Sequence, residues 1–282
     1  MSKSKAKKKK LRFYEINLLL VIGVLSLFLV MIFVNDFITN SESKYEVVSR
    51  VDDLEKEKNK ETQGFVNMSW LKVQGTNIDL PIVRALYSEI SNNEDGNYPV
   101  QLERFGWTLE EDDSYHNVIN LMGHNIFNLS ANPMIGDKSF HRFEDIMSFT
   151  YEDFAKKNKY IQYTIDGKDY VYKIFAASFL YPIDVELLST GDYSKNEKEN
   201  YIKLMKDNSI YDYDVSVNSD DDLISVITCT RMFGTEGTSD FMIVGRKVHE
   251  GEKLSNYGLV INDNYKRVEK VMKGDDVNEK ES

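Results

Sequence analysis

Cysteine is almost absent from this sequence, because Cys229 is the only one among 282 residues. One thiol cannot close an internal disulfide, so no disulfide framework holds the fold together. The sequence also has no cysteine pair and no H-E-x-x-H run, which argues against a zinc site. Composition leaves two roles for the lone thiol: a small buried core residue, or a group retained for chemistry.

Beyond the first residues of the chain, acidic residues clearly outnumber basic ones. The formal net charge is −11, even though seven basic residues lie between Lys3 and Arg12. A protein that binds nucleic acid needs a basic face to neutralise phosphates. The acidic remainder of the chain therefore argues against nucleic acid as a partner.

Long hydrophobic runs are also absent, except for one near the N-terminus. Residues 16–34 carry no charge and directly follow the basic cluster. Such a length spans a hydrocarbon core of roughly 30 Å as a helix, and flanking positive charge stays in the cytoplasm. We therefore predict a cytoplasmic segment over 1–15, a transmembrane anchor over 16–38 and an extracellular remainder at the cell membrane. The alternative is a cleaved signal peptide, which would have a shorter apolar region and a small-residue cleavage site.

Composition divides the extracellular part into a stalk, one domain and a tail. Residues 39–63 are highly charged and contain no proline or glycine, which predicts a solvated, helix-prone stalk. Residues 64–249 carry enough apolar residues to bury the core of one domain of ordinary size. Residues 250–282 are charged and poor in apolar residues, which predicts a loosely ordered tail.

Short β-rich runs dominate the predicted domain. Hairpins are predicted at 68–83, around the turn formers of QGTN, and at 159–182, around DGK. Further strands are predicted at 117–122, 222–228 and 241–248, and helices at 143–157 and 194–209. Strands and helices do not alternate strictly, so we predict a mainly β fold, an antiparallel or mixed barrel with peripheral helices.

Cys229 follows the predicted strand at 222–228, in the run DDLISVITCTRMFG. The strand would hold the thiol rigidly at its carboxyl end, and the loop beyond would leave it accessible. A nucleophilic cysteine needs thiolate character, a proton-handling partner and a group that holds the developing oxyanion. The position of Cys229 therefore favours a reactive thiol over a buried core residue.

The proton-handling partner would be one of four histidines. They are His116, His124, His141 and His249. His124 comes directly after Gly123, which ends a predicted strand, so its setting matches that of Cys229. The other three precede a strand, precede a predicted helix or lie in the tail. The setting favours His124, although a lone histidine also often has a structural role.

Three runs of the sequence resemble the sortases, membrane-anchored cysteine transpeptidases of Gram-positive bacteria. VITCTR, which contains Cys229, is similar to the TLxTC signature, and INLMGHN is similar to the element that supplies the catalytic histidine. NMSWLKVQGTNIDLPIV resembles the opening hairpin of the family, and Tyr98 fits the aromatic position that follows it. The resemblance covers residues 64–248, and the helix predicted at 194–209 points to the class B subgroup.

The resemblance implies an eight-stranded sortase-type barrel and a transpeptidase activity. In the implied mechanism, the Cys229 thiolate attacks a threonine carbonyl in the C-terminal sorting motif of a secreted protein, and His124 protonates the leaving amine. An amine of a peptidoglycan precursor, or a pilin lysine in pilus assembly, then resolves the thioester. The resemblance implies no metal ion and no organic cofactor.

The sequence departs from the family pattern at a third position. An arginine is expected where the strand after the cysteine begins, but the matching run DFMIVGR places Asp240 there. Arg231, two residues after Cys229, is the local candidate for the missing role, and the alternative is an exposed loop arginine. Arg246 matches a later basic position, and Arg104 is a more distant candidate.

Two alternatives to an active transpeptidase stay open. One is a sortase-like protein with impaired chemistry, because Asp240 stands in the place of arginine. The other is a membrane-tethered binding protein with a buried structural cysteine. The carboxylates of residues 218–222 could attract Ca²⁺, but they lack the spacing of a dedicated calcium loop and are interpreted as a solvated turn.

Overall fold

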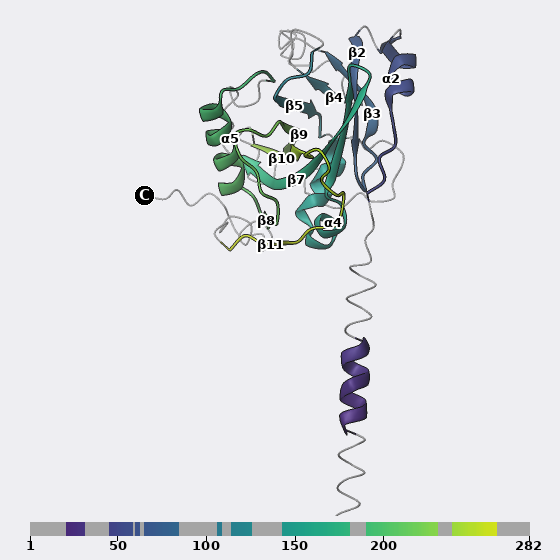
Figure 1. Cartoon of the computed structure of the whole chain (residues 1–282). Helices are drawn as coiled ribbons and strands as arrows, with labels where there is room; N and C mark the ends of the chain where they lie inside the picture. Colours follow the sequence, from purple (N-terminus) through teal and green to yellow (C-terminus); the bar gives the residue numbers. More distant parts are fainter. Residues whose placement is uncertain are drawn as a thin grey trace, which may run out of the picture. The chain divides into compact units, whose positions relative to one another are not determined.

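The computed structural model describes residues 21–31, 45–58, 60–62, 65–84, 106–108, 114–125, 143–180, 190–230 and 239–263. The chain forms two compact units, residues 1–44 with 254–256, and residues 45–253 with 257–282. In the first unit, residues 21–31 form a helix (Figure 1). The large apolar residues of this helix are exposed. No helix within the described residues has the length and apolar character needed to span a membrane. The predicted anchor over 16–38 extends beyond the described residues on both sides.

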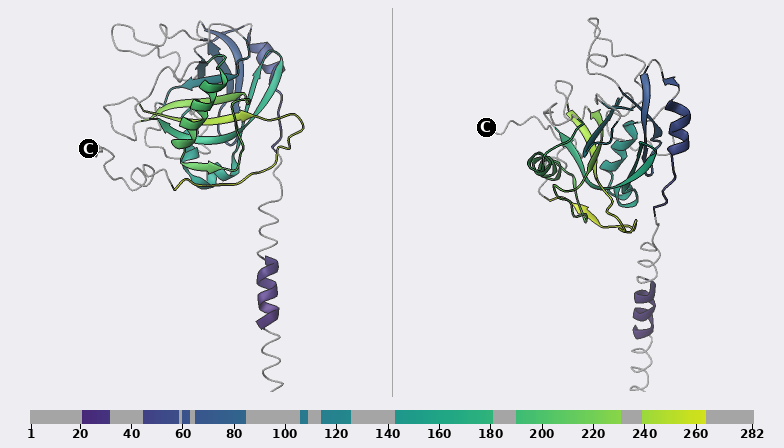
Figure 2. Two further views of the ribbon diagram at one scale, coloured as in Figure 1. Left: turned by 60° about the vertical axis from the view of Figure 1, so that its left-hand side comes forward. Right: turned by 45° about the horizontal axis from the view of Figure 1, so that its top comes forward.

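The second unit is built around one sheet that closes on itself. Its strands are β1 (Glu61–Thr62), β2 (Phe65–Val73), β3 (Asp79–Arg84), β4 (Gly106–Thr108), β5 (Val118–Gly123), β6 (Tyr160–Ile165), β7 (Lys168–Leu180), β9 (Leu223–Thr230) and β10 (Ser239–Lys247). The order among the described strands is β1-β2-β3-β4-β5-β9-β10-β7-β6, and β2 also pairs with β6. Figures 1 and 2 show the strands of this unit as a strongly curved sheet. Leaving out β1, eight strands form the ring. The prediction of a mainly β barrel is confirmed.

The barrel is mixed rather than wholly antiparallel. β3 pairs with β4 and β5 pairs with β9 in parallel, and the remaining neighbours run antiparallel. The hairpin predicted around DGK is β6–β7. Its turn residues Asp166 and Gly167 have φ of 52° and 67°, the left-handed conformation that two-residue hairpin turns require and that aspartate and glycine tolerate.

Helices cover the outside and one end of the barrel. They are α2 (Val51–Lys58), the 3-10 helix η2 (Phe143–Thr150), α4 (Glu152–Lys157) and α5 (Lys195–Asp207). α5 begins at a capping box, in which the Ser194 side chain accepts from the backbone N–H of Glu197 and the Glu197 carboxylate accepts from that of Ser194. Its buried residues include Tyr201 and Met205. The helices predicted at 143–157 and 194–209 are confirmed.

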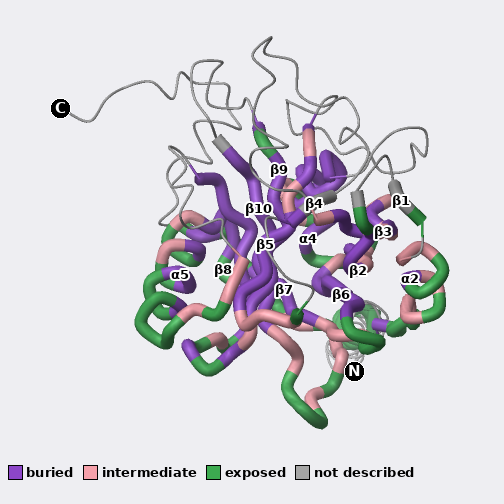
Figure 3. Tube along the Cα trace, turned by 90° about the horizontal axis from the view of Figure 1, so that it is seen from above, coloured by how far each residue is buried: buried purple, intermediate pink, exposed green. Residues whose placement is uncertain are grey.

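The barrel core is continuous along the central strands. Figure 3 shows β5, β7, β9 and β10 buried over most of their length. Apolar residues of these strands, such as Val226 and Ile243, meet Phe143 and Phe149 of η2 in one cluster. Each fully buried side chain of this kind contributes about 1.5–3 kcal/mol of hydrophobic free energy. Close packing of the cluster holds these four strands rigidly.

The described part of the predicted stalk packs on the barrel. Tyr45 and Leu54 are 6% and 1% exposed, and the Tyr45 ring stacks on that of Tyr160 with centroids 4.7 Å apart. Arg50 pairs with Asp79 at 2.5 Å. The predicted helix is present as α2, and much of residues 45–58 is exposed, but Tyr45 and Leu54 are buried, so this part of the segment is not a free spacer.

Asp79 on β3 is the anchor for this segment. Arg50, Lys72 and Trp70 all donate hydrogen bonds to its carboxylate, at 2.5 to 2.8 Å. Burial alone would favour the neutral acid, but these donors outweigh it and lower the pKa of Asp79 to about 2. The carboxylate therefore stays charged and ties the N-terminal segment to the first hairpin.

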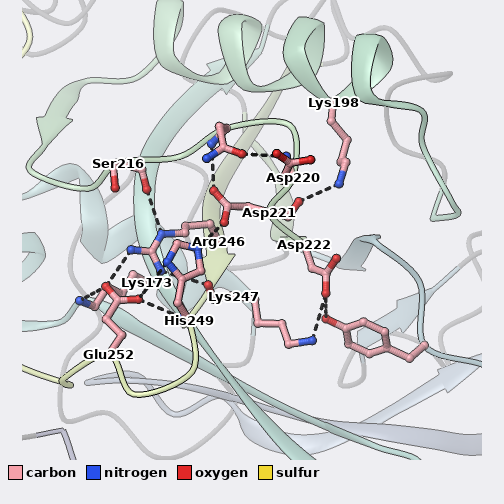
Figure 4. A network of polar contacts seen from close by, with 12 residues as sticks. Lys173, Lys198, Ser216, Asp220, Asp221, Asp222, Arg246, Lys247, His249 and Glu252 are labelled. Carbon is pink, nitrogen blue, oxygen red and sulfur yellow. Dashed lines mark hydrogen bonds and ion pairs between the residues drawn. The ribbon is translucent and has the colours of Figure 1, made fainter.

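The beginning of the predicted tail is also part of the barrel unit. Glu252 accepts hydrogen bonds from Arg246 at 2.6 and 2.8 Å and from Lys173 at 2.6 Å (Figure 4). The bonds from Arg246 hold the pKa of the Glu252 carboxyl well below its ordinary value. Further on, β11 (Leu259–Ile261) pairs with β8 (Tyr211–Tyr213). The prediction of a loose tail is wrong for residues 250–253 and 257–263, and residues 264–282 lie outside the described residues.

Candidate active site

Two parallel strands bring His124 and Cys229 together. β5 and β9 pair in register from Val118 opposite Leu223 to Gly123 opposite Thr228. The next residues along the two chains are His124, directly after the end of β5, and Cys229, the next residue of β9. Neighbouring strands lie roughly 4.8 Å apart, so the two residues stand side by side at the carboxyl ends of the pair.

Both side chains belong on the same face of the sheet. Asn120 of β5 is paired with Ser225 of β9, and their side chains hydrogen-bond to each other. The Tyr201 hydroxyl of α5 lies 3.0 Å from both. Side chains alternate along a strand, so His124 and Cys229, each four residues further on, share this face with Asn120 and Ser225. The face that carries α5 is therefore the one that carries the site.

Cys229 is exposed, whereas the other residues of β9 are buried. Hydrogen bonds fix the backbone on either side of its thiol. The Asn125 side-chain amide donates to the Cys229 carbonyl at 2.9 Å, and the Thr228 hydroxyl donates to the Gly123 carbonyl at 2.8 Å. An exposed thiol on a rigid strand agrees with the prediction of an accessible cysteine and not with the alternative of a buried structural one.

Among the described histidines, only His124 follows a strand that runs parallel to β9, so it alone comes at the same end of the sheet as Cys229. His116 precedes β5 and lies 3.7 Å from Asp192. His249 lies 2.5 Å from Asp221 in the network of Figure 4. His141 is outside the described residues.

Gly123 has a packing role that sequence reasoning missed. A Cβ at this position would lie 2.2 Å from a ring carbon of Phe143 in η2. Only glycine lets the buried Phe143 ring pack directly against the backbone at the end of β5. The close contact positions the backbone immediately before His124.

Asp240 is the third residue at this end of the sheet. It pairs with Cys229 on β9 and with Leu180 on β7. Its side chain is buried, with 9% of the residue exposed, and burial raises the pKa of Asp240 to about 7. The structure therefore places a carboxyl directly beside the thiol, at the position where the sequence pattern leads one to expect an arginine.

Of the three arginines proposed from the sequence, Arg246 is the one within the described residues, and it does not lie beside Cys229. Arg246 pairs with Leu223 at the opposite end of β9, and its guanidinium binds Glu252 and the Ser216 carbonyl (Figure 4). Arg231, Arg104 and Tyr98 lie outside the described residues. The role of Arg246 is therefore structural.

The carboxylates of the acidic turn at residues 218–222 form ion pairs with residues of other segments, and Figure 4 shows the polar contacts around them. Asp220 pairs with Lys195, Asp221 with His249, and Asp222 with Lys247. Asp221 is also buried, so the interpretation as a solvated turn is wrong for this residue. No group of three or more metal-ligating side chains occurs within the described parts of the chain.

Comparison with known proteins found similarity in structure but not in sequence. No protein-family model and no curated protein matches the chain. Sortase B of Clostridium perfringens superposes with a TM-score of 0.51, at 22% identity over 71% of this chain and 98% of that chain. A Staphylococcus aureus sortase B–substrate complex gives the same TM-score at 19% identity, over 71% and 84%.

Proposed function

Because its barrel has the class B-like sortase fold, we propose that this chain is a cysteine transpeptidase of the sortase type. It would cleave a C-terminal sorting motif of secreted proteins through a Cys229 thioester and transfer the acyl group to an amine. The observation that carries the proposal is the position of Cys229, exposed on a rigid strand beside His124. The fold alone would not carry it, because one fold can host several functions.

The pair of residues can perform both halves of the reaction. The Cys229 sulfur bonds to the threonine carbonyl carbon of the motif, and the C–N bond breaks when His124 gives a proton to the leaving amine. A second amine then attacks the thioester carbon, and His124 takes up its proton. The C–S bond breaks, and the Cys229 thiolate is restored beside the protonated His124. Neither half needs a cofactor.

The substrate classes follow from the same chemistry. The similar Staphylococcus aureus structure is a complex with substrate, and for this chain we propose secreted proteins that carry a sorting motif. The amine would come from a peptidoglycan precursor or from a pilin lysine. An N-terminal anchor over residues 16–38 would hold the enzyme at the outer face of the cell membrane, next to such substrates.

Arg231 would assist by binding substrate carbonyls near Cys229. A guanidinium has five N–H donors in a fixed fork and suits this role. The rival is an exposed loop arginine without a function. An Arg231→Ala variant distinguishes the two, because a substrate-binding role predicts slower acylation at low peptide concentration, and an exposed loop residue predicts no change.

The test of the proposal is acylation of the single cysteine. The full chain in detergent would be incubated with a library of sorting-motif peptides and its mass measured, beside Cys229→Ala as control. We expect an acyl-fragment adduct on the wild type and none on the control. A folded wild type that forms no adduct with any peptide would leave the membrane-tethered binding protein as the better hypothesis.

A further inference from the structure

Asp240 lies directly opposite Cys229 in the antiparallel pair of β9 and β10. Residues paired in this way point to the same face of the sheet, and their Cβ atoms are about 4.5–5.5 Å apart. A group at that distance reaches the same substrate atoms that the thiol reaches. The Asp240 side chain therefore belongs to the site whatever its role is there.

The surroundings of the Asp240 carboxyl do not compensate a negative charge. On the β7 side it is paired with Leu180, and on the β9 side with Cys229. The next strand, β5, leads to His124, which lies beyond Cys229. Within the described residues, no hydrogen-bond donor or cation binds this carboxyl, although it is nine-tenths buried. A buried carboxylate without a partner is unfavourable, so the neutral acid is the preferred form.

We propose that Asp240, as the neutral carboxylic acid, donates a hydrogen bond to the substrate carbonyl oxygen while Cys229 attacks the carbonyl carbon. This inference rests on the proposed transpeptidase function and assigns its oxyanion donor. A neutral acid has an O–H that can serve as donor. Donors aimed at a developing oxyanion are among the largest contributions to catalysis of acyl transfer.

The proton of Asp240 stays on its own oxygen throughout the step. The sulfur–carbon bond forms, and the electron pair of the carbonyl π bond moves to the oxygen, which accepts the Asp240 hydrogen bond. When the carbonyl re-forms, the C–N bond breaks, and the leaving amine takes its proton from His124. Asp240 is thus a hydrogen-bond donor and not a general acid, and only its neutral form can act.

Ionisation of Asp240 would reverse its effect. A carboxylate beside Cys229 disfavours both the thiolate and the oxyanion, because like charges repel at this distance. Burial sets the pKa of Asp240 at about 7, so acylation by the wild type is expected to weaken as the pH rises above 7. An amide at this position would keep an N–H donor at every pH.

The experiment measures acylation of Cys229 in the wild type, Asp240→Asn and Asp240→Leu. The probe is a library peptide that acylates the wild type, and the full chain in detergent is followed by mass between pH 5.5 and 8.5. We expect the leucine variant to react roughly 10²- to 10³-fold more slowly at pH 6. The asparagine variant should stay close to wild type at pH 6 and exceed it about tenfold for each pH unit above 7.

Alkylation by iodoacetamide separates an oxyanion role from an effect on the thiol or on folding. Alkylation forms no oxyanion, so Asp240→Leu should be alkylated at pH 6 as fast as the wild type. Equal losses in alkylation and acylation, or a leucine variant that is acylated at the wild-type rate, would overturn the role of Asp240 alone. A wild type that no peptide acylates, but that iodoacetamide labels, would overturn the proposed function and this inference with it.

Discussion

Asp240 connects the pH to the stability of the site as well as to its chemistry. Burial raises its pKa in the folded protein to about 7, whereas an unfolded aspartate titrates near ~3.9. Between these two values the folded state holds a proton that the unfolded state has released. The free energy of unfolding therefore falls as the pH rises from about 4 to about 7.

Asp240→Asn is expected to remove this pH dependence. At pH 8 the variant should be more stable than the wild type, by at most on the order of 4 kcal/mol from a shift of about three pKa units. At pH 4 the two proteins should have nearly the same stability, because both carry a neutral group. Urea unfolding at the two pH values measures the difference. A difference of the same size at both would contradict the assignment of a neutral Asp240.

His124→Gln is expected to slow acylation of Cys229 by roughly 10²- to 10⁴-fold, because the leaving amine loses its proton donor. The comparison is His116→Gln, at the other end of β5, where the histidine lies near Asp192. The His116 variant should react at the wild-type rate. Adduct formation measured by mass under single-turnover conditions tests both, and equal rates in the two variants would remove His124 from the mechanism.

The sequence could predict that His124 and Cys229 lie at the ends of strands, because each one follows a local strand signal. For Asp240 the sequence shows only that an aspartate stands where the family pattern has an arginine, and it does not show that the side chain is buried. Its burial depends on Leu180 and Cys229, which lie on two other strands. The ion pair of Arg246 could not be predicted either, because its partner Glu252 lies in the part of the sequence that predicts a loose tail. Such pairings depend on tertiary contacts that no local pattern encodes.

At the scale of elements, the contact between η2 and the end of β5 determines how His124 is presented. Gly123 leaves room for the ring of Phe143, and a methyl group there would lie 2.2 Å from a ring carbon. Phe143 is fully buried, so the ring has little space to move. The backbone before His124 would have to shift instead.

Gly123→Ala should therefore destabilise the fold by about 1–3 kcal/mol, the usual range for overpacking. Acylation of Cys229 should slow as well, because His124 moves with the backbone. Gly191→Ala is the matched control, since a Cβ there meets no atom within 4 Å. Thermal unfolding and adduct formation would be measured on both, and an unchanged Gly123→Ala variant would show that the contact does not position His124.

Elements with strong local signals were predicted correctly, and elements stabilised by distant contacts were not. The β6–β7 hairpin has turn residues that favour its geometry, and α5 has a capping box. α2 looks like a solvated helix because most of its residues are charged, yet Leu54 is buried. Likewise β11 is short and forms only by pairing with β8.

At the scale of the whole molecule, the expected topology places the barrel outside the cell. In intact cells that make the protein, a membrane-impermeant maleimide should label Cys229, the only thiol of the chain. The labelled protein should sediment with the membranes, because residues 16–38 are expected to anchor it. Labelling only after lysis would contradict this orientation. Labelled protein in the medium would favour the cleaved signal peptide, and Cys229→Ala gives the background.

The parallel pair β5–β9 also has a consequence for the order of events in folding. Asn120 and Ser225 are 105 residues apart, and β6, β7 and α5 all lie between them. Pairings between such distant segments form late, since loop closure must be completed before the contact contributes. His124 and Cys229 therefore meet only when the barrel is nearly complete. With the proposed topology and function, a chain still crossing the membrane would carry an ordinary thiol, and Cys229 would gain its partner only after the barrel has folded outside the cell.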